Sequence, residues 1–155
     1  MTLKNKTALI TGSTSGIGLA LAQHFASLGV NIVMNGFGDA AEIEANRAAL
    51  EAQGVQAIYH GADMSKPQEI EALTSLALET FGTVDILINN AGIQYVKPID
   101  EFAPEKWDAI MAINLSSAFH TTRLLAPAMK VAGWGRVVNI ASVHGLVASA
   151  YKAAY

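Results

Sequence analysis

Three glycines form the first cluster of residues with a recognisable chemistry. They are spaced Gly12-x3-Gly16-x-Gly18, directly after the apolar, β-branched run Thr7 to Thr11, and they open a helical pattern. A glycine-rich turn between a strand and a helix lets backbone N–H groups approach a pyrophosphate, and the helix N-terminus adds partial positive charge. Taken alone, this loop is also compatible with a tight strand-to-helix turn that binds nothing.

A second cluster, Asn89 to Gly92 (NNAG), closes another apolar run, Val84 to Asn89. Open α/β sheets bind ligands at the carboxyl ends of their strands, which is where this cluster falls, although alone it could be a turn. Further along the chain lie Asn114 in a long helical pattern, Ser142 after the last apolar run, and Tyr155 with twelve residues between it and Ser142.

Strands and helices must hold these clusters in place. Apolar runs predict five strands, over residues 7–11, 31–35, 56–60, 84–89 and 136–140. Apolar residues at helical spacing predict four helices between them, over about 17–28, 39–53, 65–81 and 104–130. Strands that are continuously rather than alternately apolar, separated by helices, predict a doubly wound α/β fold whose parallel sheet is buried on both faces. Residues 1–155 are expected to form a single domain.

Capping and stripe patterns refine the helices. Asp39 with Glu42 and Ser65 with Gln68 have the spacing of capping boxes. Pro104 suits a first helical turn, and Pro127 should bend or loosen the last turns of the same helix. The apolar stripes expected to face the core are Ile17, Leu21, Phe25 and Leu28 in the first helix, and Ile70, Leu73, Ala77 and Phe81 in the third.

The composition narrows the class of protein. The 155 residues carry a net charge of −3, are 52% hydrophobic and 15% charged, and include no cysteine. These values exclude an intrinsically disordered chain, a disulfide framework and a basic nucleic-acid-binding surface. Polar residues interrupt every apolar stretch too often for a membrane span, so we expect a soluble, cytoplasmic protein. We also expect no metal site, because His24, His60 and His120 lack metal-ligand spacing.

Taken together, the motifs resemble those of the short-chain dehydrogenases/reductases over the whole chain. The resemblance rests on the order TGxxxGxG (Thr11 to Gly18), NNAG (Asn89 to Gly92), Asn114, Ser142 and Tyr155. It implies a Rossmann-type fold and an oxidoreductase that transfers a hydride. A full member of the family has about 250 residues. We therefore expect the last strands and helices to be missing from these 155 residues, which alone should be inactive.

The resemblance assigns the catalytic residues. A hydroxyl that is oxidised by hydride transfer must also lose its proton, and an ordinary tyrosine with a pKa of about 10 is too protonated to take it at neutral pH. In the family, a lysine four residues after the tyrosine and the positive nicotinamide stabilise the phenolate. Tyr155 would be the acid/base and Ser142 the residue that orients the substrate oxygen. Asn114 would organise a water-linked proton relay by loosening its helix. Lys152 does not stand at the family lysine position.

The cofactor expected by resemblance is NAD. A 2′-phosphate would need a nearby Lys or Arg, and Asn35 to Asp39 contains none, although the carboxylate typical of NAD sites is also missing. Asp39 is equally a helix cap, and Phe37 could fill the space of a 2′-phosphate. The expected cofactor contacts are Gly12, Thr14, Ser15, Gly16, Ile17, Gly18, Phe37, Asp63, Asn90, Ala91 and Gly92.

Four stretches, at 35–44, 89–94, 105–110 and 139–149, look most like the members of this family that act on a short 3-hydroxy acid. That similarity implies that Gln94, His144 and Lys152 hold a substrate carboxylate beside Ser142 and Tyr155. An amide, an imidazole and an ammonium group can each hydrogen-bond a carboxylate. Each also has a plain structural reading, as a loop residue, a turn histidine and a surface lysine.

Two other functions remain open from the sequence. One is a reductase of 3-oxoacyl thioesters or another small ketone on the same scaffold, because the fold does not choose the substrate. The other is a nucleotide-binding module without catalysis. As partners we expect a small 3-hydroxy or 3-keto acid and, as in relatives, a homotetramer, with neither nucleic acid nor membrane bound.

Overall fold

Five parallel strands form one sheet in the computed structural model, which describes residues 2–155. The strands are β1 (Thr7–Ile10), β2 (Asn31–Asn35), β3 (Ala57–His60), β4 (Ile86–Asn89) and β5 (Arg136–Asn139), in the order β3-β2-β1-β4-β5. Every neighbouring pair is parallel; Ile10, for example, is in register with Met34 of β2 and Ile88 of β4. The chain therefore reverses its direction of winding between β1 and β4, and the crevice expected at such a reversal lies at their carboxyl ends.

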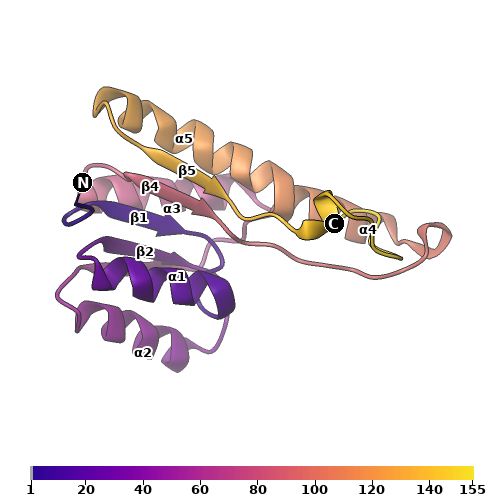
Figure 1. Ribbon diagram of the computed structural model, residues 1–155, viewed down its shortest axis with the longest axis horizontal. Coiled ribbons are helices and arrows are strands. Elements are labelled where there is room, and N and C mark those ends of the chain that lie inside the picture. Colours follow the sequence, from indigo (N-terminus) through magenta and orange to yellow (C-terminus); the bar gives the residue numbers. More distant parts are fainter. Residues whose placement is uncertain (1) are drawn as a thin grey trace.

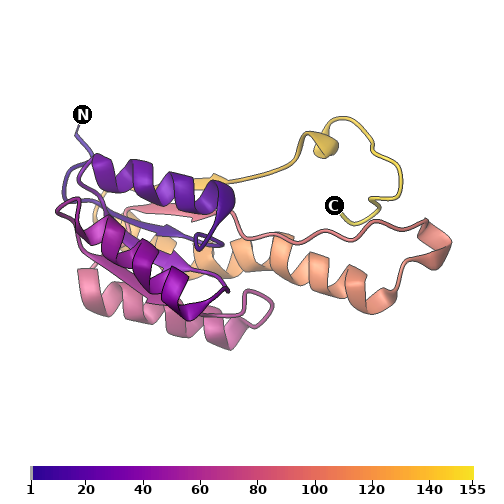
Figure 2. The ribbon, with the colours of Figure 1, turned by 90° about the horizontal axis from the view of Figure 1, so that it is seen from below.

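Helices cover both faces of the sheet (Figures 1 and 2). They are α1 (Gly16–Ser27), α2 (Ala40–Glu51), α3 (Pro67–Phe81), α4 (Pro104–Ile110) and α5 (Ser117–Val131). Ala8 and Ile10 join the cluster on the α1 and α2 face, whereas Leu9, between them, joins the cluster with α3 and α5 residues. Successive side chains of a strand point to opposite faces, so both faces are buried and the strand reads as continuously apolar.

The apolar stripe predicted for α1 is right for Leu21 and Phe25, which are partly buried against the core, and wrong for its other two residues. The face of α1 that is buried consists of Gly18, Ala22 and Ala26, whereas Ile17 and Leu28 are exposed. Small residues let this helix lie close to the sheet, which the apolar stripe did not indicate. β5 forms one edge of the sheet and is exposed at all four residues, which fits the expectation that further strands and helices of the family are missing from these 155 residues. The stripe of α3 is as predicted for Ile70, Leu73 and Ala77, which are buried.

Of the two predicted helix caps, one forms and the other does not. The Asp39 carboxylate accepts hydrogen bonds from the N–H groups of Ala41 and Glu42, as predicted. Ser65 does not cap α3, whose N-cap is Lys66, because the Ser65 hydroxyl donates instead to Asp63. An N-cap hydroxyl accepts from helix N–H groups, but Asp63 holds both the hydroxyl and the N–H of Ser65 in the preceding turn, and α3 begins only at Pro67.

The predicted long helix over 104–130 is interrupted. A π-helical segment, Met111–Ser116, separates α4 from α5, and α5 continues through Pro127 to Val131. Beyond the sheet, the segment after β5 loops away from the connection between β4 and α4 and returns to it near the C-terminus (Figure 2), where Lys97 N–H donates to the Tyr151 carbonyl at 2.9 Å.

Candidate active site

The glycine loop after β1 is shaped by close backbone approach. Gly12 has a positive φ of 64°, which favours glycine. A Cβ on Gly18 would collide with the Gly12 carbonyl and lie 2.7 Å from the Asn90 amide nitrogen. A Cβ on Gly16 would meet open space within the described chain. The loop is therefore closed on its Gly18 side and open above Gly16, where a ligand could approach.

The N-terminus of α1 leaves donors available beside this loop. Its N-cap, Ser15, makes no side-chain capping hydrogen bond within residues 2–155. The first backbone hydrogen bond of the helix is donated by Leu19 N–H to the Ser15 carbonyl. The N–H groups of the preceding helical residues have no partner along the helix, and they carry the positive end of its dipole. This arrangement suits a phosphate group.

The NNAG segment is bonded to the glycine loop and is not an independent turn. The Thr11 hydroxyl accepts from the N–H groups of Asn90 and Ala91, both at 3.0 Å. The Asn90 amide in turn donates to the carbonyls of Thr11 and Gly12, at 2.9 and 3.0 Å. The ends of β1 and β4 are thereby held together at the winding reversal.

A groove follows the carboxyl ends of β1, β2, β3 and β4. Its lining consists of Gly12, Thr14, Ser15, Asn35, Gly36, Phe37, Ala62, Asp63, Met64, Asn90, Ala91, Gly92, Ile93 and Ile113. Eight of the predicted cofactor contacts are in this lining, and Gly16 and Gly18 belong to the loop beside it. The open space at Gly16 together with the free α1 donors fits a dinucleotide phosphate, so the residues present are compatible with such a cofactor.

Asp63 is the charged residue of this groove lining. Its carboxylate accepts from the Ser65 hydroxyl at 2.7 Å and from the Ser65 N–H at 2.9 Å. The Ser65 hydroxyl and N–H, with the Lys66 ammonium, hold the pKa of the Asp63 carboxyl below its ordinary value. Asp63 therefore stays an ionised acceptor at neutral pH.

A second cavity brings together the three predicted catalytic residues. Asn114, Ser142 and Tyr155 all line it, with Ile17 at the start of α1. Asn114 lies in the π-helical segment and clamps Ile93: its amide oxygen accepts from Ile93 N–H and its nitrogen donates to the Ile93 carbonyl, both at 2.9 Å. The helix is thus locally widened at Asn114, the position at which the family resemblance implies a loosened helix.

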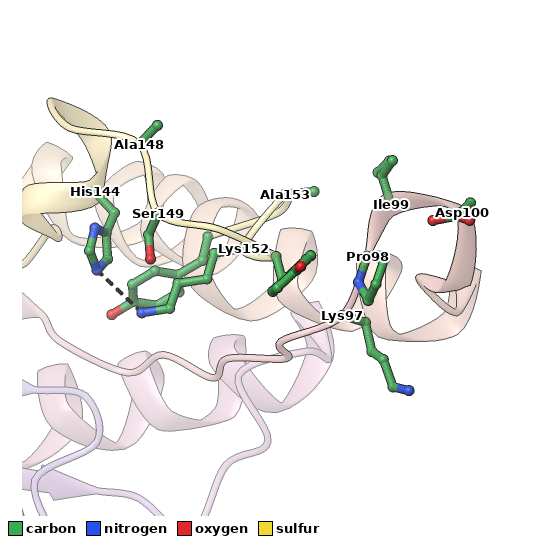
Figure 3. A pocket seen from close by; sticks show the side chains of 11 residues that line it. Lys97, Pro98, Ile99, Asp100, His144, Ala148, Ser149, Lys152 and Ala153 are labelled. Atoms are coloured by element: carbon green, nitrogen blue, oxygen red, sulfur yellow. Dashed lines mark hydrogen bonds between the residues drawn. The ribbon is translucent and has the colours of Figure 1, made fainter.

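A third cavity shares Tyr155 with the second and contains a basic pair (Figure 3). Lys152 Nζ lies 3.2 Å from His144 Nε2, and His144 Nδ1 lies 3.3 Å from the Val147 carbonyl. The backbone N–H of His144 donates to the Ser142 hydroxyl at 3.1 Å. This hydrogen bond joins the third cavity to the second one. The ring centroids of His144 and Tyr155 are 6.5 Å apart.

Gln94 does not join the basic pair. It is exposed on the segment after Gly92 and lies outside the lining of the third cavity as the described chain forms it. Lys97 lines that cavity, but its ammonium pairs with Glu101 at 3.1 Å and points away from His144 (Figure 3). Of the three expected carboxylate ligands, the structure brings two together.

Two further observations concern residues outside these cavities. Across the described residues 2–155, no three His, Asp or Glu side chains gather into a possible metal site. Nor is any helix in that part of the chain long and apolar enough to cross a membrane.

Sequence reasoning missed Thr11 and Asn35, both buried and both bonded to the groove loops. Asn35 is the last residue of β2, and Thr11 directly follows β1. A polar side chain at the end of an apolar run, where the turn does not require it, could have indicated both residues in the sequence. A polar group that is buried there must find hydrogen-bond partners.

Comparison with known proteins agrees with this geometry. The sequence pattern of the short chain dehydrogenase family matches residues 6–155, and the chain belongs to that family. It is 60% identical over 153 residues to a D-beta-hydroxybutyrate dehydrogenase of Cupriavidus necator and 54% identical to one of Rhizobium meliloti. The predicted resemblance to family members that act on a short 3-hydroxy acid is thereby confirmed.

The two alignments cover 99% and 97% of this chain but 59% and 58% of those relatives, so the chain spans less than two thirds of their length. Among solved structures, a metagenomic short-chain oxidoreductase in complex with NADP matches with a TM-score of 0.93 at 35% identity, over 100% of this chain and 70% of that one. The predicted Rossmann-type parallel sheet is confirmed.

Proposed function

We propose that the whole protein is an NAD-dependent oxidoreductase that interconverts D-3-hydroxybutyrate and acetoacetate. The observation that carries this proposal is the position of Tyr155, which lines both the cavity with Ser142 and Asn114 and the cavity with the His144–Lys152 pair. An acid/base next to a cation suits a short substrate with a hydroxyl group and a carboxylate. The names of the two relatives above support the same substrate.

The groove would hold the dinucleotide, which when bound accepts or supplies the hydride. The free donors at Ser15 and Gly16 would bind its pyrophosphate, and Asp63 would contact its adenine end. Asn90, Ala91 and Gly92 lie between this groove and the second cavity, because they line both. The nicotinamide end would thus be directed toward Tyr155.

The preference for NAD rests on charge. Neither lysine nor arginine lines the groove formed by residues 2–155, and Phe37 is 67% exposed beside Gly36. The nearest arginine in sequence, Arg47, is already engaged by Glu44 at 2.7 Å, Glu51 at 2.8 Å and the Ala57 carbonyl at 2.9 Å. A 2′-phosphate would therefore meet no free cation on these elements, whereas a ribose hydroxyl needs none.

Proton transfer is assigned to Tyr155. Its phenol would take the proton from the substrate hydroxyl, while the Ser142 hydroxyl donates a hydrogen bond to the same oxygen. The π-helical segment at Asn114 supports a role in a water-linked relay, because widening a helix disturbs its regular hydrogen bonds and frees backbone groups to bind water.

Carboxylate binding is assigned to Lys152, whose ammonium group is held in place by a hydrogen bond to His144. The Val147 carbonyl can only accept, so His144 Nδ1 carries the proton in that contact and Nε2 is left to accept from the Lys152 ammonium. Both contacts are satisfied by a neutral imidazole. Two further ammonium protons of Lys152 remain for a substrate carboxylate.

A spectrophotometric assay of the whole protein tests the proposal, with NAD against NADP on D-3-hydroxybutyrate, longer 3-hydroxy acids and 3-oxoacyl thioesters. We expect NAD to be favoured by at least about tenfold in kcat/KM and D-3-hydroxybutyrate to be the best substrate. Equal use of both cofactors would contradict the cofactor assignment. Faster turnover of thioesters would favour the reductase alternative, because a thioester places no carboxylate at Lys152.

The assembly and location follow from the same resemblance. We propose a cytoplasmic homotetramer that binds a small 3-hydroxy or 3-keto acid and neither nucleic acid nor membrane. Leu115 and Phe119, at the junction of the π-helical segment and α5, are 60% and 63% exposed, and exposed apolar side chains of this size favour subunit contacts.

A further inference from the structure

Asn35 is a completely buried amide at the end of β2, with 0% of its surface exposed. It stands where a carboxylate for the cofactor ribose was sought in the sequence. Because its side chain is completely buried and both of its amide protons are donated within the protein, we do not assign it as that ribose ligand. Its contacts assign it a different task.

The Asn35 side chain connects two loops of the groove. Its nitrogen donates to the carbonyls of His60 and Ala62, at 3.0 and 2.9 Å, where β3 ends. Its oxygen accepts from Gly12 N–H at 3.4 Å, at the start of the glycine loop. Ala62 directly precedes Asp63, so one amide spans from the phosphate loop to the residue expected at the adenine.

The Asn35 backbone fixes the same glycine loop from the other side. Asn35 N–H donates to the Ser13 hydroxyl at 3.1 Å, and the Asn35 carbonyl accepts from Ser13 N–H at 2.6 Å. Ser13 is also completely buried, and its hydroxyl donates to the Ile10 carbonyl at 2.7 Å. The loops after β1, β2 and β3 are thereby tied into one unit.

Only an amide can make this set of side-chain contacts at this size. Two carbonyl oxygens require two donors, and Gly12 N–H requires an acceptor. An aspartate has the same shape but would place a negative charge against the carbonyls of His60 and Ala62. An alanine would leave those carbonyls and Gly12 N–H without this partner.

We propose that Asn35 is a positioning residue that sets the spacing between the phosphate loop and the adenine side of the cofactor groove. This inference rests on the proposed function, because it requires that the groove bind a dinucleotide. Asn35 acts on the cofactor through the loops it holds and not by touching it.

The test uses the whole protein with the variants Asn35→Asp and Asn35→Ala and measures dissociation constants for NAD, NADP and ADP-ribose by calorimetry. The matched controls are Asn31→Asp and Asn31→Ala, at the opposite end of β2, where the Asn31 amide oxygen accepts from Gln56 N–H at 3.0 Å. Hydrogen exchange of the peptides over 11–16 and 60–65 reports on the two loops directly. Thermal unfolding records the stability of all four variants.

We expect both Asn35 variants to weaken ADP-ribose binding about tenfold or more and to speed exchange in both peptides, because buried groups lose their partners. KM for the hydroxy acid at saturating cofactor should stay within about twofold. The Asn31 variants should bind ADP-ribose normally even where their melting temperature falls. A fall in stability without a change in binding, or loss of the fold in both Asn35 variants, would overturn the inference.

The cofactor proposal can fail separately. If the parent protein binds NADP and not NAD, the NAD assignment is wrong, while weaker NADP binding by the Asn35 variants still supports the positioning role. If the parent protein binds none of the three ligands, both proposals are overturned.

Discussion

In the proposed reaction, the Tyr155 phenol and the Lys152 ammonium handle the two ends of a short hydroxy acid. The two residues are close in sequence, and Tyr155 N–H donates to the Lys152 carbonyl at 3.3 Å. Their side chains line the same cavity, with His144 between the amine and the Val147 carbonyl. Single substitutions can therefore separate proton transfer from carboxylate binding.

The change Tyr155→Phe removes only the hydroxyl. In the whole protein we expect turnover to fall by about 100-fold or more, because general acid/base catalysis contributes about that much, while the NAD dissociation constant stays within about threefold. Steady-state kinetics and calorimetry measure the two effects. Tyr95→Phe is the control, since Tyr95 packs edge-on against Phe102 and is not in the lining of either cavity that Tyr155 lines. Turnover near the parent value in Tyr155→Phe would remove the acid/base assignment.

The change Lys152→Ala removes the proposed carboxylate ligand. Charge-assisted hydrogen bonds contribute about 1.5 to 3 kcal/mol, so we expect KM for 3-hydroxybutyrate to rise about tenfold to a hundredfold with little change in NAD affinity. Lys97→Ala is the matched control, because Lys97 lines the same cavity but its ammonium pairs with Glu101. If the two variants raised KM equally, the effect would be general electrostatics and not a specific contact.

At the scale of elements, the start of α1 sets how closely this helix approaches the glycine loop. Gly18 allows the helix to contact the Gly12 carbonyl and the Asn90 amide, and Asn90 ties both to the end of β4. The π-helical segment does the equivalent for the second cavity, where Asn114 fixes Ile93. In both cases a local departure from regular packing places a backbone segment that the site needs.

The change Gly18→Ala inserts a methyl group into that contact. We expect it to lower the free energy of unfolding by about 2 to 3 kcal/mol through overpacking and to weaken dinucleotide binding. Gly54→Ala is the comparison: Gly54 has a φ of 88° and open space around an added Cβ in the described chain, so it should cost only about 1 kcal/mol of backbone strain. Urea unfolding measures both. Equal costs would mean that the close approach of α1 to the glycine loop is unimportant.

At the scale of the whole molecule, the β5 edge of the sheet and the small part of one face beside it are uncovered in these residues. β5 is exposed along its length, and an apolar groove lined by Phe25, Ile86, Ile88 and Trp134 lies beside it. Exposed edge strands pair readily with other chains. The relatives of known activity are longer than this chain by about two fifths of their length.

A polypeptide restricted to residues 1–155 should therefore self-associate and lack dehydrogenase activity. Size-exclusion chromatography with light scattering should show species larger than the 16.3 kDa monomer. Val138→Lys on β5 should reduce the association, because a charge on an edge strand opposes pairing, whereas Val131→Lys at the end of α5 should not. A folded, monodisperse monomer of the parent polypeptide would contradict this prediction.

Short sequence patterns were enough to predict the order of the strands and helices, the parallel sheet and the family. The run 31–35 became β2 without change, and Asp39 caps α2, because strand periodicity and capping depend on a few neighbouring residues. The motifs that carry the family resemblance were readable for the same reason. Ser65 was misjudged because Asp63 binds both its hydroxyl and its N–H in the turn before α3, which the spacing alone did not reveal.

Contacts between distant segments required the folded chain. The strand order β3-β2-β1-β4-β5 brings the ends of β2 and β3 beside the glycine loop, and this is what gives Asn35 its three side-chain partners, 23 to 27 residues away. The approach of Lys152 to His144 depends on how the segment after β5 folds back on itself, whereas Gln94 is exposed on the separate segment after β4. The type of a side chain determines which hydrogen bonds it can donate or accept, and this is known from the sequence. Which partner it binds depends on the geometry of the whole sheet.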